Sequence, residues 1–233
     1  MHLHLPLIAV LVAAIALFVI WRSRRGFTLT PGAEHQAVGP DAALAKLQAG
    51  AERLARGERL SREGREKLAE LAKQQQPFAV LVGCSDSRVA PELIFGCGLG
   101  DLFVVRQAGN TVGDRGLGSI VYGVEVLGAA LIVVLGHARC GAVEAAARLA
   151  EDDDAFSGAL KQAIEPILPA VHKAKERNPT DLVTAAVHEN VRSIVERLKT
   201  STEPALAERV ADGRLKVVGA YYDLVSGEVE FFA

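Results

Sequence analysis

Beyond Pro77 the chain carries short apolar runs that lack polar alternation. A run of this kind, bounded by glycine or polar residues, is typical of a strand that is buried on both faces, as in a parallel sheet. Residues 215–224 and 229–232 flank a Ser226-Gly227 turn, which predicts a hairpin at the end of the chain. The other predicted strands are residues 78–83, 102–105 and 131–135.

Helical patterns alternate with these strands. Asp41 is a candidate N-cap for a helix over residues 42–56, and Ser61 for a second helix that runs to about residue 74. Further helices are predicted over residues 116–127, 142–150 and 182–198. This alternation favours an α/β fold with a mainly parallel sheet, flanking helices and an antiparallel edge strand at the C-terminus.

The most apolar segment is at the N-terminus. Residues 7–21 are all apolar and, extended back to residue 3, they reach the short end of the ~17–25 residues that cross a bilayer. Arg22, Arg24 and Arg25 follow the apolar run instead of preceding it, unlike the charges of a secretory signal. We therefore expect an N-terminal hydrophobic helix that anchors the chain in a membrane and leaves the C-terminal part on the cytoplasmic side.

The alternative for this segment is an export signal that sends the protein to the periplasm. Residues 23–27 look like a twin-arginine motif, but the sequence after them is polar and interrupted by glycine and proline. The predicted organisation is a hydrophobic segment over residues 1–25, a linker over 26–40 and one folded domain over 41–233.

Composition and charge exclude some classes of protein. Half of the 233 residues are hydrophobic and 23% are charged, as in a globular protein, and the formal net charge is only −2. A basic stripe with interleaved aromatic residues is missing, so we expect no nucleic-acid partner. Three widely spaced cysteines do not form a disulfide framework, and metal ligation or plain burial is the better interpretation.

A candidate metal site follows from the ends of two predicted strands. Cys84 follows the first strand, and His137 and Cys140 follow the third. The carboxyl ends of parallel strands lie at the same edge of a sheet, so these side chains are expected to converge. Two thiolates and an imidazole suit zinc, and three protein ligands leave the fourth position for water, as in a catalytic site. The competing interpretation is that all three residues are simply buried.

Asp86 and Arg88 add a charged pair beside this site. The pair would hold the carboxylate where it accepts a hydrogen bond from water at the metal. Alternatively, Asp86 is itself the fourth ligand and closes the site, or the two residues form an ordinary surface ion pair.

Two sequence blocks resemble the signature of the β-class carbonic anhydrases. They are Cys84-Ser85-Asp86-Ser87-Arg88-Val89 and residues 136–143, Gly-His-Ala-Arg-Cys-Gly-Ala-Val, and the similarity extends from about residue 40 to 232. The resemblance implies one Zn²⁺ per chain on Cys84, His137 and Cys140, and a catalytic dyad of Asp86 and Arg88. It also implies the reversible hydration of CO2 to bicarbonate and a proton by zinc-bound hydroxide, catalysed by residues 41–233 in a homodimer or a higher homo-oligomer.

The resemblance extends to the substrate pocket. Gln75 matches a glutamine that contacts the substrate in the plant-type branch, and Phe103 and Tyr122 match aromatic residues that line its pocket, partly across the dimer interface. The N–H of Gly141, just inside a helix, is placed to polarise an oxygen of CO2. Each of these residues also has an ordinary structural interpretation. Arg106 matches one residue of the regulatory site of the bicarbonate-regulated branch, but Leu81 stands where that branch has tryptophan.

Three rival functions were considered. The first is hydrolysis of carbon disulfide or a similar small molecule by the same fold and metal, and the second is a non-catalytic zinc protein that Asp86 closes. The third is a nucleotide-binding protein, suggested by Gly96, Gly98 and Gly100. We reject it because these glycines precede a strand, whereas a phosphate-binding loop joins a strand to a helix.

Overall fold

The computed structural model describes residues 38–57, 68–69 and 71–232. The predicted hydrophobic helix, most of the linker and most of the helix assigned to Ser61 fall outside these residues. Within them, no helix is long and apolar enough to cross a bilayer. The first described helix, α2 (Pro40–Ala55), begins two residues earlier than predicted, with Gly39 and not Asp41 as its N-cap. Proline is well tolerated at this first helical position, where its missing N–H has no helical partner.

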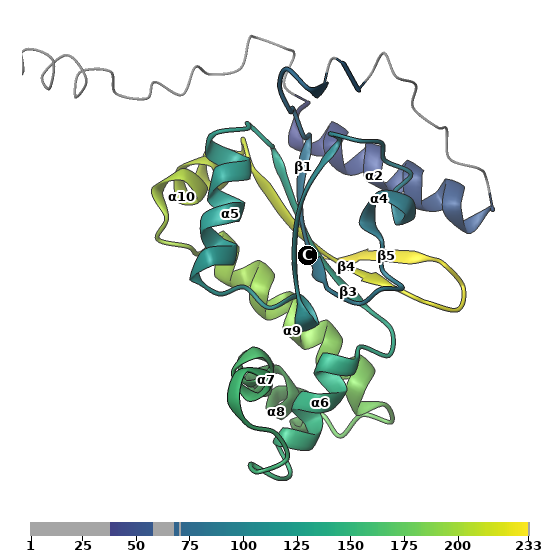
Figure 1. The fold of residues 1–233 in the computed structure, drawn as a ribbon, viewed down its shortest axis with the longest axis vertical. Helices are drawn as coiled ribbons and strands as arrows, with labels where there is room; N and C mark the ends of the chain where they lie inside the picture. The colour runs from purple at the N-terminus through teal and green to yellow at the C-terminus, as the bar shows by residue number, and fades with distance from the viewer. Residues whose placement is uncertain (1–37, 58–67, 70, 233) are drawn as a thin grey trace, which may run out of the picture. The chain divides into compact units, whose positions relative to one another are not determined.

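The centre of the domain is a five-stranded sheet in the order β2-β1-β3-β4-β5 (Figure 1). The first four strands in this order are parallel, and β5 pairs antiparallel with β4, which confirms the predicted fold class. Each predicted apolar run is a strand, with small differences at the ends. The strands are β1 (Ala79–Cys84), β2 (Leu102–Gln107), β3 (Leu131–His137), β4 (Lys216–Tyr222) and β5 (Val229–Phe232).

Successive residues of β1 and β3 enter two different cores, because side chains alternate across a strand. Val80 and Val82 pack on the side of α5 (Asp114–Glu125), α9 (Leu182–Lys199) and α10 (Pro204–Ala211). Ala79 and Leu81 pack on the side of α2 and α4 (Pro91–Ile94). Figure 1 shows helices on both faces of the sheet. Burial on both faces explains why β1 and β3 carry unbroken apolar runs.

Three further helices lie beyond the carboxyl ends of the strands, at the bottom of Figure 1. They are α6 (Gly141–Leu149), α7 (Gly158–Ile164) and α8 (Leu168–Glu176). The apolar faces of α6 and α8 form a third core with the first half of α9, and this core includes Cys84 and Cys140. The sequence predicted α6 and α9, whereas α7, α8 and α10 were not predicted. The edge of the sheet that carries the candidate site is therefore covered by helices.

Candidate metal centre

The structure brings Cys84, His137 and Cys140 together at the carboxyl edge of the sheet. Cys84 ends β1, and His137 ends the neighbouring parallel strand β3. The sulfur atoms of the two cysteines are 3.9 Å apart, and the candidate ligand atoms of all three residues lie within 4.8 Å of one another. Their exposed fractions are 5%, 0% and 1% in chain order, so the cluster is buried.

The turn between β3 and α6 places Cys140 beside His137. Arg139, between them, adopts a φ of 51°, a left-handed conformation that few non-glycine residues occupy. This reversal allows the chain to leave the strand and begin α6 immediately, with Cys140 as the N-cap. The left-handed conformation of Arg139 therefore sets the positions of His137 and Cys140 relative to each other.

The donor set fits a tetrahedral zinc ion. Zn–S bonds of about 2.3 Å at a tetrahedral angle separate two sulfurs by about 3.8 Å, close to the distance between Cys84 and Cys140. The Nδ1 of His137 lies 2.9 Å from the carbonyl oxygen of Ala138, which can only accept, so Nδ1 carries the proton. Nε2 then presents a lone pair, and it is a buried atom without a hydrogen-bond partner. A metal ion would satisfy this atom.

Hydrogen bonds converge on the Cys84 sulfur. The Cys140 thiol lies within hydrogen-bond distance of it, and the backbone N–H of Gly109 donates to it at 3.3 Å. These bonds, with that of Cys140 the strongest, lower the pKa of Cys84 below its usual value despite burial, because they stabilise the thiolate. The same contact raises the pKa of Cys140, so the surroundings favour the thiolate at Cys84 and the thiol at Cys140.

Asp86 and Arg88 form a bidentate ion pair next to the cluster. Arg88 donates from Nε to Oδ1 of Asp86 at 2.9 Å and from Nη2 to Oδ2 at 2.7 Å, and its backbone N–H also donates to Oδ1. These bonds hold the pKa of Asp86 well below its usual value. Arg88 also donates to the carbonyl oxygen of Arg139, which joins the two halves of the site.

The carboxylate of Asp86 stands beside the three ligands without joining them. Its Oδ2 is 3.9 Å from Nε2 of His137, and its side chain is 15% exposed. Both oxygens accept hydrogen bonds from Arg88, and Asp86 does not belong to the three-residue cluster. The structure therefore shows an Asp86 carboxylate that Arg88 holds beside the three candidate ligands.

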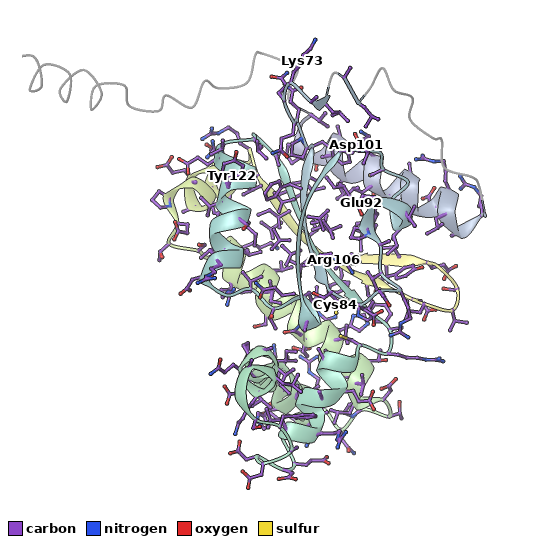
Figure 2. The ribbon with its side chains drawn as sticks, in the orientation of Figure 1. Lys73, Cys84, Glu92, Asp101, Arg106 and Tyr122 are labelled. Atoms are coloured by element: carbon purple, nitrogen blue, oxygen red, sulfur yellow. The ribbon has the colours of Figure 1, made fainter. Side chains whose placement is uncertain are left out.

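Arg106 braces the loop that carries Cys84 and Asp86 (Figure 2). Its Nε donates to the carbonyl oxygen of Cys84 at 2.8 Å, and its Nη2 donates to that of Asp86 at 2.7 Å. The sequence singled out Arg106 only as a match to a regulatory residue. In the structure its guanidinium holds the backbone between a candidate ligand and the carboxylate.

The residues assigned to the substrate pocket do not all gather here. Gly141 begins α6 next to Cys140, and its N–H is among those that a helix leaves without an internal partner. Phe103 lies four residues before the end of β2, about 13 Å along the strand from the level of Cys84. Its ring is 6.0 Å from that of Tyr122, which is 43% exposed, and Figure 2 shows Tyr122 and Cys84 at opposite ends of the sheet. Gln75 is exposed ahead of β1.

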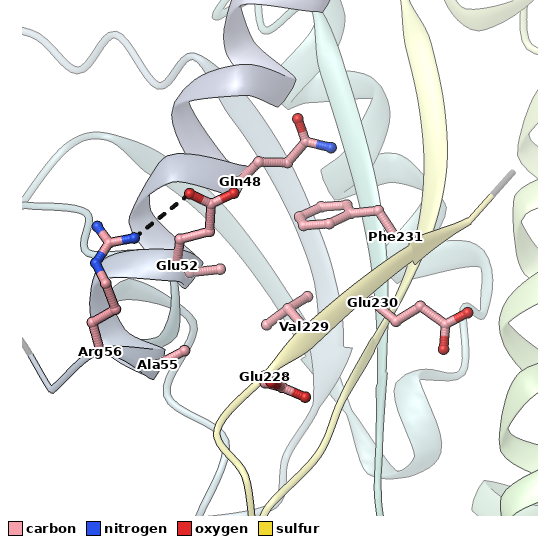
Figure 3. Close-up of a pocket in the computed structure, with 9 residues that line it drawn as sticks. Gln48, Glu52, Ala55, Arg56, Glu228, Val229, Glu230 and Phe231 are labelled. Atoms are coloured by element: carbon pink, nitrogen blue, oxygen red, sulfur yellow. Dashed lines mark ion pairs between the residues drawn. The ribbon is translucent and has the colours of Figure 1, made fainter.

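A groove of about 580 Å³ lies between α2 and the edge strand β5, away from the cluster (Figure 3). Its lining contains the acidic residues Glu52, Glu228 and Glu230 beside the apolar Val229 and Phe231, but no cysteine or histidine. The third cysteine, Cys97, is half-buried away from the other two, and burial raises its pKa to about 12. Cys97 therefore stays a protonated thiol and is not part of the cluster.

Sequence reasoning missed two residues that shape the site, Gly109 and Arg139. The signal for Gly109 was its place in the segment Ala108-Gly109-Asn110, a few residues beyond the predicted strand over residues 102–105. Its φ of 64° and its contact with Cys84 became visible only in the folded chain. Arg139 gave no signal, because arginine is not a residue that predicts a left-handed turn.

Comparisons with known proteins point to one family. The family model described as carbonic anhydrase matches residues 79–229. A carbonic anhydrase of Mycolicibacterium smegmatis is 39% identical over 195 residues, which cover 82% of this chain and 92% of that protein. Carbonic anhydrase 2 of Mycobacterium tuberculosis is 43% identical over 162 residues, which cover 68% of this chain and 76% of that protein.

Solved structures agree with these relatives. The chain is similar to a tetrameric β-carbonic anhydrase of Sordaria macrospora, with a TM-score of 0.64 and 28% identity over 82% of this chain and 95% of that one. It is also similar to the β-carbonic anhydrase CcaA, with a TM-score of 0.62 and 29% identity over 72% and 85% of the two chains. The sequence, the fold and the buried cysteine–histidine cluster thus agree, and the chain belongs to the β-carbonic anhydrase family of enzymes.

Proposed function

We propose that this protein catalyses the reversible hydration of CO2 with one zinc ion held by Cys84, His137 and Cys140. The observation that carries the proposal is the Asp86 carboxylate, which Arg88 holds 3.9 Å from the unpartnered Nε2 of His137. A purely structural metal site has no need of a separately held carboxylate beside its ligands. The family membership supports the same activity.

When bound, zinc supplies a Lewis acid that makes a water molecule acidic enough to lose its proton near neutral pH. The residues of the chain supply the rest. Asp86 stays ionised because Arg88 lowers its pKa, so it acts as a hydrogen-bond acceptor that orients the attacking water. The N–H of Gly141 is oriented by α6 and stabilises the negative charge that develops on an oxygen of CO2.

A homo-oligomer is part of the proposal. Tyr122 is exposed beside Phe103, far from the ligands of its own chain, so these aromatic residues can line a pocket only around another protomer's metal centre. The relatives of known structure from Sordaria macrospora are tetrameric. We infer that Gln75, Phe103 and Tyr122 complete the substrate pocket of a neighbouring subunit.

The test combines metal analysis with stopped-flow CO2 hydration on the full-length protein. We expect one zinc per chain and rapid hydration in the parent, and full zinc content with strongly reduced kcat in Asp86→Asn and Arg88→Leu. The exposed residue Asp153 provides the control, since Asp153→Asn should keep both zinc and activity. A zinc-loaded parent without CO2 hydration up to about pH 9 would contradict the proposal, and turnover of carbon disulfide would then favour the rival substrate.

A further inference from the structure

A buried asparagine on α9 contacts the turn that supports the Cys84 sulfur. Asn190 is 3% exposed, and its Nδ2 donates to the carbonyl oxygen of Gly109 at 2.9 Å. Because a carbonyl can only accept, the orientation of the Asn190 amide is unambiguous. Asn190 stands on the apolar face of α9, beside Val187 and Val191, where a polar side chain needs a specific partner.

The turn that Asn190 holds is conformationally demanding. Gly109 has a φ of 64° and the next residue, Asn110, a φ of 46°, so two successive residues occupy the left-handed region. Such a conformation persists only where neighbouring groups hold it. A Cβ on Gly109 would come within 2.5 Å of Ile167 Cδ1, so the surroundings also fit closely around the bare glycine.

Gly109 forms hydrogen bonds with both Asn190 and Cys84. Its carbonyl accepts from Asn190, and its N–H donates to the Cys84 sulfur at 3.3 Å. The bond to the carbonyl restrains the peptide plane that follows the Gly109 Cα, and the left-handed φ and ψ of Gly109 relate this plane to the preceding one, which carries the N–H. The helix itself is held against the metal edge, because Val187 and Val191 pack directly on Gly136, the residue before His137.

We infer that Asn190 is a positioning residue of the metal centre, which orients the Gly109 N–H toward the Cys84 sulfur. The inference rests on the zinc site of the proposed function. Mutation of a residue that hydrogen-bonds to a metal ligand commonly lowers the metal affinity by about 10- to 100-fold. Asn190 therefore controls how firmly Cys84 holds the metal, although it touches neither the metal nor the substrate.

The experiment compares Asn190→Leu and Asn190→Ser with the parent. The leucine variant keeps the volume without the donor, and the serine variant stays polar but is too short to reach Gly109. Val195→Ala is the matched control. Val195 is also a buried residue of α9, but it lies in the second half of the helix and packs in the core that α9 forms with the sheet, α5 and α10. The first readout is the rate at which a chelator removes zinc. The second is the scalar coupling between the Gly109 amide proton and a spin-active cadmium isotope that replaces zinc.

We expect both Asn190 variants to release zinc at least about tenfold faster than the parent and to lose the amide–cadmium coupling. Val195→Ala should lower the unfolding free energy while it keeps the parental release rate and coupling. Parental values in either folded Asn190 variant, or equally fast release from Val195→Ala, would overturn the inference. Neither readout uses CO2, so a failure of the proposed activity is distinguished from a failure of this inference.

Discussion

At the scale of single residues, the metal centre depends on polar atoms that are buried and aimed at a common point. His137 shows this most clearly, because Nδ1 is bound to the Ala138 carbonyl oxygen whereas Nε2 has no partner. An unpartnered buried nitrogen costs about 1–3 kcal/mol unless another group satisfies it. The protein therefore tolerates a local cost that metal binding removes.

The ligand assignment predicts that metal and activity are lost together. Cys84→Ser and His137→Ala should each lower the zinc content from about one per chain toward zero and reduce kcat/KM by more than about 100-fold, since even indirect partners of a metal matter by 10- to 100-fold. Atomic absorption and stopped-flow hydration measure the two effects. Cys97→Ser is the control for the loss of a thiol, and a comparable loss of zinc in that variant would contradict the assignment.

Glu189 carries a pH-dependent part of the stability. This carboxylate is 2% exposed and forms ion pairs with Lys173 at 2.8 Å and with Arg192 at 3.1 Å, and with Arg177. Burial by itself would raise the pKa of Glu189, but these cations, foremost Lys173, outweigh it and lower the pKa below its usual 4.5. A lowered pKa stabilises the fold above the unfolded value, and this contribution is lost as the pH falls through the folded value.

Glu189→Gln should therefore lower the free energy of unfolding by about 1–3 kcal/mol at neutral pH, the range for hydrogen bonds to charged groups. The difference from the parent should shrink as the pH falls below about 4.5. Urea unfolding between about pH 3 and pH 7 measures it. Asp153→Asn, which removes an exposed partner of Lys161, should have an effect near zero. A deficit of Glu189→Gln that grows toward acid pH would contradict this assignment.

At the scale of elements, α9 connects the sheet to the metal edge. Its second half packs on the sheet with α5 and α10, and its first half packs with α6 and α8. The helix approaches β3 closely because Gly136 has no side chain. A Cβ there would lie 2.7 Å from both Val187 Cγ1 and Val191 Cγ2.

Gly136→Ala should push α9 away from β3 and lower the free energy of unfolding by about 1–3 kcal/mol, the usual cost of overpacking. Combined with Val191→Ala, it should cost less than the sum of the two single changes, because both affect the same contact. Gly118→Ala is the matched control, since a Cβ at Gly118 in α5 meets no atom within 4 Å and alanine favours the helix. If the losses in unfolding free energy of Gly136→Ala and Val191→Ala simply add, close contact between these two residues does not explain the cost of Gly136→Ala.

The elements that the sequence missed are short helices. The helices α7, α8 and α10 have 7, 9 and 8 residues, so their apolar period is short, and they lack the run of alanines that marks α6, which also has 9 residues. Helices of this length draw their stability from tertiary packing rather than from local propensity. The strands were predicted well because burial on both faces leaves an unbroken apolar run.

At the scale of the whole molecule, the parallel sheet gathers all three ligands at one edge and leaves Phe103 and Tyr122 near the other. A pocket that needs both sets of residues therefore needs two protomers. Cys84→Ser removes a ligand, and Tyr122→Ala removes a residue of the proposed pocket, so each homo-oligomer should be impaired.

Mixing these two variants through unfolding and refolding should restore activity, because some protomer pairs then combine an intact ligand set with an intact aromatic wall. With random pairing in symmetric dimers, about half of the dimers contain one copy of each variant, and one of the two metal centres in such a dimer is complete. About a quarter of the parental kcat is therefore the expected upper limit. Stopped-flow hydration before and after refolding measures the gain. If the mixture never exceeds the mean of its components, each metal centre uses only residues of its own chain.

The sequence alone determined the strands and the fold class, and it identified the three candidate metal ligands that the structure brings together. Unbroken apolar runs report burial on both faces, and parallel strands bring their carboxyl ends to one edge. Only the tertiary structure decided that Arg106 braces the loop of Cys84 and Asp86, and that Gly109 and Asn190 support the Cys84 sulfur. These contacts join residues far apart in the chain or depend on left-handed turns, and a pattern of hydrophobic and polar positions records neither.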